Sequence, residues 1–210
     1  MNHSAGRDSR ADYVRDPELR ARLASLIDEG WEIFERFDSE VRGKRFHPFV
    51  AADYDRVLAA LLALPASGGR FVEWGSATGV ITIMASMLGF EAYGIELDPA
   101  LVRIARSLAE RFGARAVFAE GSFVPSGYRW RPPTGDGRLG TIGDGPSAYP
   151  MIGYPLDEFD FVFGYPWGGE EPMMLDLMRS YGQPGALLLL HGDGGVTTYR
   201  DGRVLSAPAA

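Results

Sequence analysis

The stretch FVEWGSATG, residues 71–79, decides the fold that this 210-residue sequence predicts. It begins as a short apolar run with β character and breaks into five small residues before an apolar run of helical length, VITIMASMLGF. We therefore expect a strand, a tight turn and a helix. Small residues in such a turn let the backbone approach a bulky ligand and leave the free N–H groups of the helix N-terminus open to a polar or anionic group.

The spacing of the small residues discriminates between ligands. In the dinucleotide fingerprint G-x-G-x-x-G, a register that starts at Gly75 puts Val80 in the third glycine position, where its side chain is too large. Counted in steps of two, the chain instead gives Glu73, Gly75, Ala77 and Gly79. This register resembles motif I of the class I S-adenosylmethionine-dependent methyltransferases, acidic-x-Gly-x-Gly-x-Gly, with alanine as the middle residue. A strand-to-helix turn that binds no ligand is the alternative, since short glycine motifs often match by chance.

The next segment, EAYGIELDPALVRIARSLAERFG, repeats the pattern of a strand followed by a helix. We expect the strand to end at Glu96 and the helix to be capped by Asp98 and Pro99. Glu96 lies 21 residues beyond Gly75. An acid about 20 residues after the glycine turn is placed to accept hydrogen bonds from two ribose hydroxyls. The alternative is a solvated charge at a strand end.

A third strand, ARAVFAE, leads to Glu120, Gly121 and Ser122. In the methyltransferase family this loop often reads Gly-Asp, and the acid binds the adenine amino group. Because serine follows Gly121 here, the resemblance implies that this contact is weaker or passes to Glu120.

The segments around this core are of three kinds. Residues 1–16 are polar and predict a mobile tail. Residues 17–66 carry two amphipathic helices that either pack on the sheet or form part of a lid, with His47 as a residue that could reach substrate.

Residues 124–158 are rich in Pro and Gly and show no helical period, although a doubly wound sheet needs a crossover here. Its aromatic anchors favour a partly ordered flap over a disordered segment.

The fourth strand, FDFVFG, is followed by GYPWGGEEP, which resembles motif IV of the same methyltransferases, where residues after this strand line the acceptor pocket. Tyr165 and Trp167 could hold a planar or cationic acceptor. Gly164 stands where enzymes that methylate amines carry a side-chain oxygen, which puts amine specificity in doubt. We interpret Glu170 and Glu171 as charges at the N-terminus of a helix, with a catalytic base as the alternative.

The fifth strand, GALLLL, leads to His191 and Asp193 at the edge of the sheet where we expect the ligand. His191 is therefore the best-placed candidate for a general base, with a structural role as the alternative. The segment VTTYR-DG-RVL predicts a hairpin, which follows the fifth strand without room for a helix.

Composition narrows the class of protein. The net charge of −7 disfavours nucleic acid and anionic membranes as partners. The chain has no cysteine, which excludes thiolate metal sites, and we expect no metal and a cytoplasmic location. No run approaches the ~20 apolar residues of a membrane span.

Together these features predict an α/β protein with a doubly wound, mostly parallel sheet, helices on both faces, a C-terminal antiparallel hairpin and two N-terminal helices, whose Rossmann-like domain spans residues 67–210. The resemblance implies an S-adenosylmethionine-dependent methyltransferase, and the acidic charge and the aromatic-rich flap favour a small molecule as the acceptor. A non-catalytic binding or interaction module and, less favoured, an NAD(P)-dependent oxidoreductase are the alternatives. The cofactor residues implied by the resemblance are Glu73, Gly75, Ser76, Ala77, Gly79, Glu96, Leu97, Glu120, Gly121 and Ser122.

Overall fold

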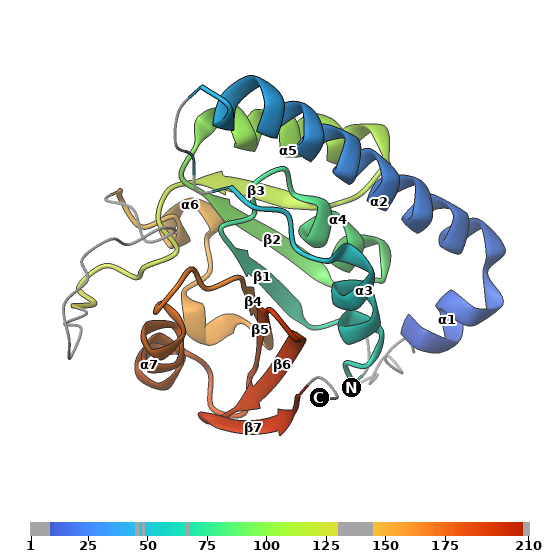
Figure 1. The fold of residues 1–210 in the computed structure, drawn as a ribbon. Helices are drawn as coiled ribbons and strands as arrows, with labels where there is room; N and C mark the ends of the chain where they lie inside the picture. Colours follow the sequence, from blue (N-terminus) through green and yellow to red (C-terminus); the bar gives the residue numbers. More distant parts are fainter. Residues whose placement is uncertain (1–8, 45–46, 48, 66–67, 130–144, 208–210) are drawn as a thin grey trace.

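The structure is a computed structural model that describes residues 9–44, 47, 49–65, 68–129 and 145–207. A single mixed sheet forms its centre. Its seven strands lie in the order β3-β2-β1-β4-β5-β6-β7 (Figure 1). The strands are β1 (Arg70–Trp74), β2 (Glu91–Glu96), β3 (Val117–Glu120), β4 (Phe161–Gly164), β5 (Leu187–Gly192), β6 (Gly195–Arg200) and β7 (Arg203–Ser206). Strands β1 to β5 pair in parallel, and β6 and β7 pair antiparallel. This confirms the predicted α/β fold with its C-terminal hairpin.

The helices form two layers. They are α1 (Ser9–Arg15), α2 (Pro17–Phe37), α3 (Tyr54–Leu62), α4 (Val80–Met87), α5 (Pro99–Arg111), α6 (Tyr149–Ile152) and α7 (Glu171–Tyr181), with a π-helical turn at Asp38–Arg42 and a 3-10 turn at Leu156–Glu158. Helices α2 to α5 cover one face of the sheet, and α6 and α7 cover the other (Figure 1).

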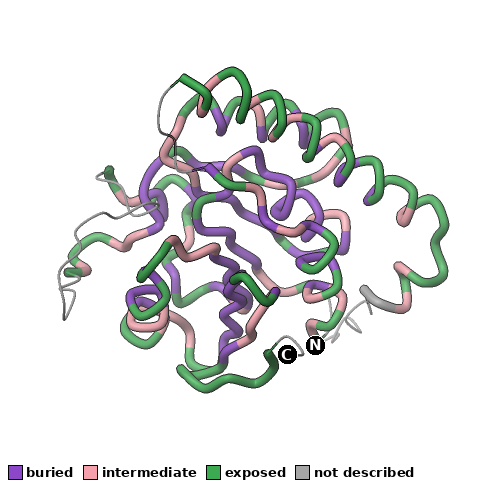
Figure 2. The backbone as a smooth tube through the Cα atoms, in the orientation of Figure 1, coloured by how far each residue is buried: buried purple, intermediate pink, exposed green. Residues whose placement is uncertain are grey.

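Strand β1 shows how one sequence serves both layers. Its side chains alternate, so that Phe71 packs in the α2–α5 layer while Val72 and Trp74 pack in the α6–α7 layer. The strands are buried through the centre of the molecule, and the outer side of α2 is exposed (Figure 2). The carboxyl end of β1, where the glycine turn begins, lines a cavity.

The N-terminal segment differs in one respect from the prediction. Residues 9–15 form helix α1 where we predicted a mobile tail, and residues 1–8 lie outside the described residues. The Arg20 guanidinium donates hydrogen bonds to the carbonyls of Tyr13 (3.0 Å) and Val14 (2.5 Å). These carbonyls at the C-terminal end of the short helix therefore have hydrogen-bond partners. Helix α2 then begins as predicted, since the Asp16 carboxylate accepts hydrogen bonds from the N–H groups of Glu18 and Leu19.

The Pro/Gly-rich insertion adds to the α6–α7 layer. Helix α6 and the 3-10 turn after it pack Tyr149, Ile152 and Leu156 into the core of the second face. They stand where the crossover helix between β3 and β4 was expected. The indole N–H of Trp74 donates a hydrogen bond of 2.9 Å to the Tyr149 hydroxyl. Residues 130–144 of the predicted flap lie outside the described residues.

The Tyr149 hydroxyl gives a first test of this packing. Replacing Tyr149 with Phe leaves the buried Trp74 N–H without an acceptor, so we expect the free energy of unfolding to fall by about 1–3 kcal/mol. Urea denaturation followed by circular dichroism measures this. Tyr181→Phe, at the half-buried end of α7, is the matched control, and equal stability of the two variants would show that the Trp74 hydrogen bond contributes little.

The C-terminal hairpin, formed by β6 and β7, lies at one edge of the sheet. Asp201 (φ 49°) and Gly202 (φ 75°) both lie in the left-handed region, as the predicted type I′ turn requires. Strand β6 follows β5 directly and pairs with it along its length, so no helix intervenes, as predicted.

Candidate functional site

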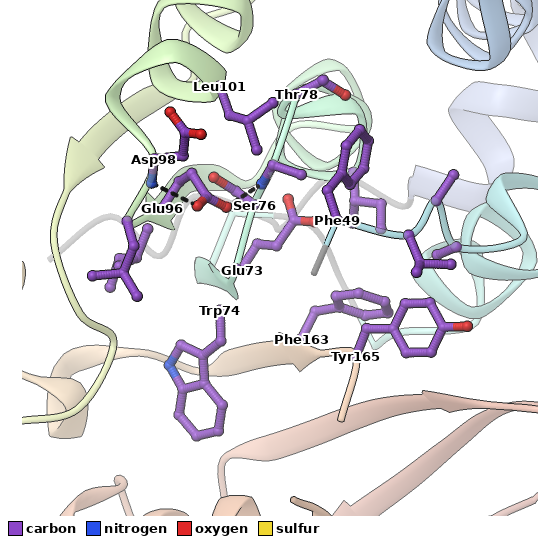
Figure 3. A pocket seen from close by; sticks show the side chains of 18 of the residues that line it. Phe49, Glu73, Trp74, Ser76, Thr78, Glu96, Asp98, Leu101, Phe163 and Tyr165 are labelled. Carbon is purple, nitrogen blue, oxygen red and sulfur yellow. Dashed lines mark hydrogen bonds between the residues drawn. The ribbon is translucent and has the colours of Figure 1, made fainter. Parts of the chain in front are cut away.

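A cavity of about 620 Å³ opens at the carboxyl ends of β1, β2 and β4 (Figure 3). This is the edge of an open α/β sheet where ligands bind, and the volume is within the ~300–1,000 Å³ of small-molecule sites. Its lining comes from the connector before α3, the glycine turn, the loops after β2, β3 and β4, and the β5–β6 turn. Of the predicted site residues, the cavity brings together Glu73, Gly75, Ser76, Ala77, Glu96, Leu97, Gly121, Tyr165 and Trp167.

The glycine turn has the backbone geometry that its sequence suggests. Gly75 (φ 71°), Ala77 (φ 45°) and Gly79 (φ 80°) all lie in the left-handed region. Ala77 therefore carries a modest backbone cost that glycine would not. A Cβ at Gly75 would meet no atom within 4 Å, whereas one at Gly79 would come within 2.6 Å of the Phe118 ring. Gly79 is thus required by packing beneath the turn, and Gly75 leaves the cavity open.

Glu96 joins the second strand to the glycine turn. Its Oε2 accepts a hydrogen bond of 2.8 Å from Ala77 N, and its Oε1 accepts one of 2.9 Å from Asp98 N (Figure 3). Burial raises the pKa of Glu96 above its ordinary value, although these backbone hydrogen bonds oppose the shift. A carboxylate oxygen can accept a second hydrogen bond, so both oxygens retain capacity for ligand hydroxyls.

Glu73 is a buried carboxylate in the cavity wall, only 4% exposed. Its Oε2 accepts hydrogen bonds from the N–H (2.9 Å) and the hydroxyl of Thr82 on α4. Burial raises the pKa of Glu73 to about 8, the hydrogen bonds from Thr82 lower it, and the charge of Glu96 adds to the rise. Without a cation beside it, this side chain is therefore largely protonated at neutral pH.

The connector before α3 forms one wall. Residues 49–52, with His47 and Tyr54, line the cavity, and helices α2 and α3 themselves pack against α4. The N–H of Phe49 donates to His47 Nδ1 (3.1 Å), which leaves Nε2 to carry the proton and donate to Asp98 Oδ2 (3.1 Å). Burial opposes ionisation of Asp98, but hydrogen bonds from Ala100 N and His47 outweigh it and lower the pKa of Asp98. His47 thus ties the connector to the loop that carries Glu96.

The loop after β4 presents Tyr165 and Trp167 to the cavity. It is held by Glu170, which is 3% exposed and whose Oε2 accepts a hydrogen bond of 2.8 Å from Trp167 N. Glu170 stands at the N-cap of α7, in line with its interpretation as a helix N-terminal charge. A Cβ at Gly164 would lie 3.0 Å from the Met174 sulfur, so close packing accounts for that glycine.

His191 is not brought into the cavity. Its ring packs 4.6 Å from the Tyr165 ring, measured between centroids, and is 6% exposed. Its Nε2 accepts a hydrogen bond of 3.2 Å from Asp53 N, and its Nδ1 is buried without a partner. Burial lowers the pKa of His191. The geometry favours the structural alternative over the general base, while Asp193, the predicted orienter, does line the cavity.

Three other predicted residues lie outside the cavity lining. Gly79 packs beneath the turn, and Glu120 is exposed at the end of β3. Ser122 is buried, with its hydroxyl accepting a hydrogen bond from Val124 N and its N–H donating to the Pro146 carbonyl. Ser122 is thus used to anchor the insertion.

The sequence analysis missed several lining residues, among them Phe49, Phe123 and Phe163. The alternation of side chains in FDFVFG could have identified Phe163. Within the described residues, no group of three acidic, His or Cys side chains is placed to hold a metal ion. None of the helices in the described part of the chain is both long and apolar enough to cross a membrane.

Comparison with known proteins finds short stretches of sequence similarity to methyltransferases. No protein-family model matches the chain. It is 29% identical over 89 residues to an uncharacterized methyltransferase of Bacillus velezensis, across 42% of this chain and 39% of the relative. It is 38% identical over 55 residues to the ribosomal protein L11 methyltransferase of Thermus thermophilus, across 26% of this chain and 22% of the relative. The chain thus matches well under half the length of these curated relatives.

Solved structures with a similar arrangement include an RNA methyltransferase from Salinibacter ruber in complex with S-adenosylhomocysteine, 20% identical with a TM-score of 0.45, across 64% of this chain and 72% of that one. Another is an S-adenosylmethionine-dependent methyltransferase from Thiobacillus denitrificans in complex with S-adenosylhomocysteine, 22% identical with a TM-score of 0.45, across 75% of this chain and 54% of that one.

The sheet and the cavity at its carboxyl edge define a Rossmann-like α/β protein with a candidate ligand site. Over part of its length the chain is similar in sequence to methyltransferases, and its strand order is that of a Rossmann-like fold.

Proposed function

We propose that this protein is a methyltransferase that transfers the methyl group of S-adenosylmethionine to a small-molecule acceptor. The observation that carries the proposal is Glu96, whose carboxylate is hydrogen-bonded to the N–H of Ala77 in the glycine turn and faces the cavity. A cofactor with a ribose and an amino-acid end needs such an acid beside an open turn.

The residues present fit this cofactor. The two oxygens of Glu96 retain acceptor capacity for ribose hydroxyls. The turn from Gly75 to Gly79 would surround the amino-acid and ribose end, and the buried Glu73 carboxylate gives a partner for the ammonium group. Leu97 and Gly121 line the part of the cavity where adenine would lie. In this proposal Glu120 and Ser122 do not bind adenine directly, because neither lines the cavity.

When bound, S-adenosylmethionine supplies a methyl group already activated by a positive sulfur, so a lone pair on the acceptor displaces S-adenosylhomocysteine. The chain's residues then have to hold both molecules in line and exclude water. Tyr165 and Trp167 orient the acceptor in this proposal, and Glu170 fixes the loop that carries them. His191 has a positioning role behind Tyr165, since its nitrogens are buried or engaged.

The class of acceptor follows from the cavity lining. None of the described lining residues is Lys or Arg, whereas a nucleic-acid site needs cations for the phosphates. This supports a small molecule over RNA, although one of the solved structures with a similar arrangement is an RNA methyltransferase. The cytoplasmic location predicted from the sequence is part of this proposal.

Calorimetric titration tests the proposal against its alternatives. We expect S-adenosylhomocysteine to bind and NADH not to bind. NADH binding without S-adenosylhomocysteine binding would establish the oxidoreductase alternative. Binding of neither would support the interaction module. Transfer of a labelled methyl group from S-adenosylmethionine into a metabolite extract then separates an active enzyme from a module that only binds cofactor.

A further inference from the structure

Aromatic rings line the end of the cavity where the proposed function places the acceptor. Phe49 and Tyr54 come from the N-terminal segment, and Phe163, Tyr165 and Trp167 come from β4 and the loop after it. Figure 3 shows Phe49, Phe163 and Tyr165 arranged around one end of the cavity, away from Glu96 and Asp98. Rings from separate elements around one space favour a flat ligand, which can stack on their faces or meet their edges.

The charged groups around the cavity are nearly all acidic. Glu73, Glu96, Asp98 and Asp193 line it, and none of the lining residues within the described ranges is Lys or Arg. The one basic group in the lining, His47, is hydrogen-bonded to Asp98. Close to the Asp193 turn, the Arg56 guanidinium is bound to the Asp53 carboxylate (3.0 Å) and to the Gly194 carbonyl (2.8 Å). No described cation therefore faces the acceptor.

We propose that the acceptor is a small planar molecule that carries a positive charge, held between the aromatic rings and the carboxylate of Asp193. This inference rests on the proposed function, because it concerns the second substrate of the same site. Carboxylates and aromatic faces without Lys or Arg form a setting that attracts cations. A phosphate or carboxylate on the acceptor would meet like charge in a partly desolvated space.

The bound cofactor does not cancel the acidic character. In the proposed function, S-adenosylmethionine contacts Glu73 and Glu96, and Asp98 is hydrogen-bonded to His47. The remaining lining acid is Asp193, which is exposed at the rim and belongs to the β5–β6 turn, away from the glycine turn. Asp193 is therefore the acid through which acceptor charge can be tested with least disturbance of the fold.

Three probes of one shape and different charge test the proposal: 1-methylquinolinium, 1-methylnaphthalene and 1-naphthoate. Each is titrated into protein saturated with S-adenosylhomocysteine, and tryptophan fluorescence reports binding. We expect the quinolinium to bind at least tenfold more tightly than naphthoate, with the neutral ring between them. Asp193→Asn should reduce this ratio about threefold, whereas Asp157→Asn, exposed in the turn before β4 and outside the cavity lining, should leave it unchanged.

The outcomes separate the two proposals. If S-adenosylhomocysteine binds but naphthoate binds as tightly as the quinolinium, or no probe binds, the acceptor class is wrong and the methyltransferase proposal stands. A charge ranking that does not respond to Asp193→Asn also overturns the assignment of Asp193. Failure to bind S-adenosylhomocysteine overturns the function itself.

Discussion

Glu96→Gln should weaken the binding of S-adenosylhomocysteine by more than tenfold, which corresponds to about 1.4 kcal/mol or more. The amide has one acceptor oxygen in place of two, and its NH₂ group faces a backbone N–H at either Ala77 or Asp98. The variant therefore loses a ribose partner and disturbs the turn that holds it. Isothermal titration calorimetry at constant pH and ionic strength measures the change.

Two further variants sharpen this prediction. Glu110→Gln, on the exposed side of α5, makes the same chemical change away from the cavity and should leave the affinity unaltered. Glu120→Gln tests the adenine contact that the family resemblance implied, and we expect little effect because Glu120 does not line the cavity. Unchanged affinity in Glu96→Gln would remove Glu96 from the site, and a large loss in Glu120→Gln would restore the sequence-based prediction.

Glu73→Gln should stabilise the ligand-free protein increasingly as pH rises from about 5 to about 9. Burial raises the pKa of Glu73 from 4.5 to about 8 in the folded state. Between these values the folded protein holds a proton that the unfolded chain has released, so stability falls as pH rises through this window. Glutamine can still accept both hydrogen bonds from Thr82, and it does not ionise.

The measurement is the difference in unfolding free energy between the two proteins, from urea denaturation at several pH values. Each unit of pKa shift corresponds to about 1.4 kcal/mol, so the difference should reach several kcal/mol at pH 9 and nearly vanish below pH 5. Taking the difference cancels the other titrating groups. Glu120→Gln, also at a strand end but exposed, is the control. Parallel pH profiles for the natural protein and Glu73→Gln would show that Glu73 is not forced to hold its proton.

Most of the sheet could be predicted because its signals are local. Each parallel strand is a short apolar run, and Asp16–Pro17 and Asp98–Pro99 mark helix starts that the structure confirms. The hairpin turn at Asp201–Gly202 is likewise fixed by two residues that accept positive φ.

The insertion could not be predicted in the same way. Helix α6 has four residues, which is too short to show a 3.6-residue period, and its stability comes from the burial of Tyr149 and Ile152 against a distant part of the chain. No local pattern encodes such a contact. The described parts of the insertion pack on the sheet, and none of them lines the cavity.

Only part of the candidate site, likewise, could be predicted from the sequence. The spacing between the glycine turn and Glu96 brought together residues that the structure joins by a hydrogen bond, because that spacing is set by one strand-turn-helix-strand unit. His191 lies outside the cavity lining, which its sequence position did not predict, because a strand-end position gives the edge of the sheet but not the direction of the side chain. Of the connector before α3, only His47 was named as a residue that could reach substrate. The lining residues 49–52 were not predicted, because loops that fold over a site carry no periodic signal.

The position of β1 in the sheet has a consequence for how the protein is made. One edge of β1 pairs with β2, which follows it closely, but the other pairs Phe71 with Phe161, 90 residues later. During synthesis this apolar edge stays open until β4 has left the ribosome, and an open hydrophobic edge is a template for aggregation. Slow translation between residues 75 and 160 should therefore lower the yield of native protein more than slow translation after Gly164.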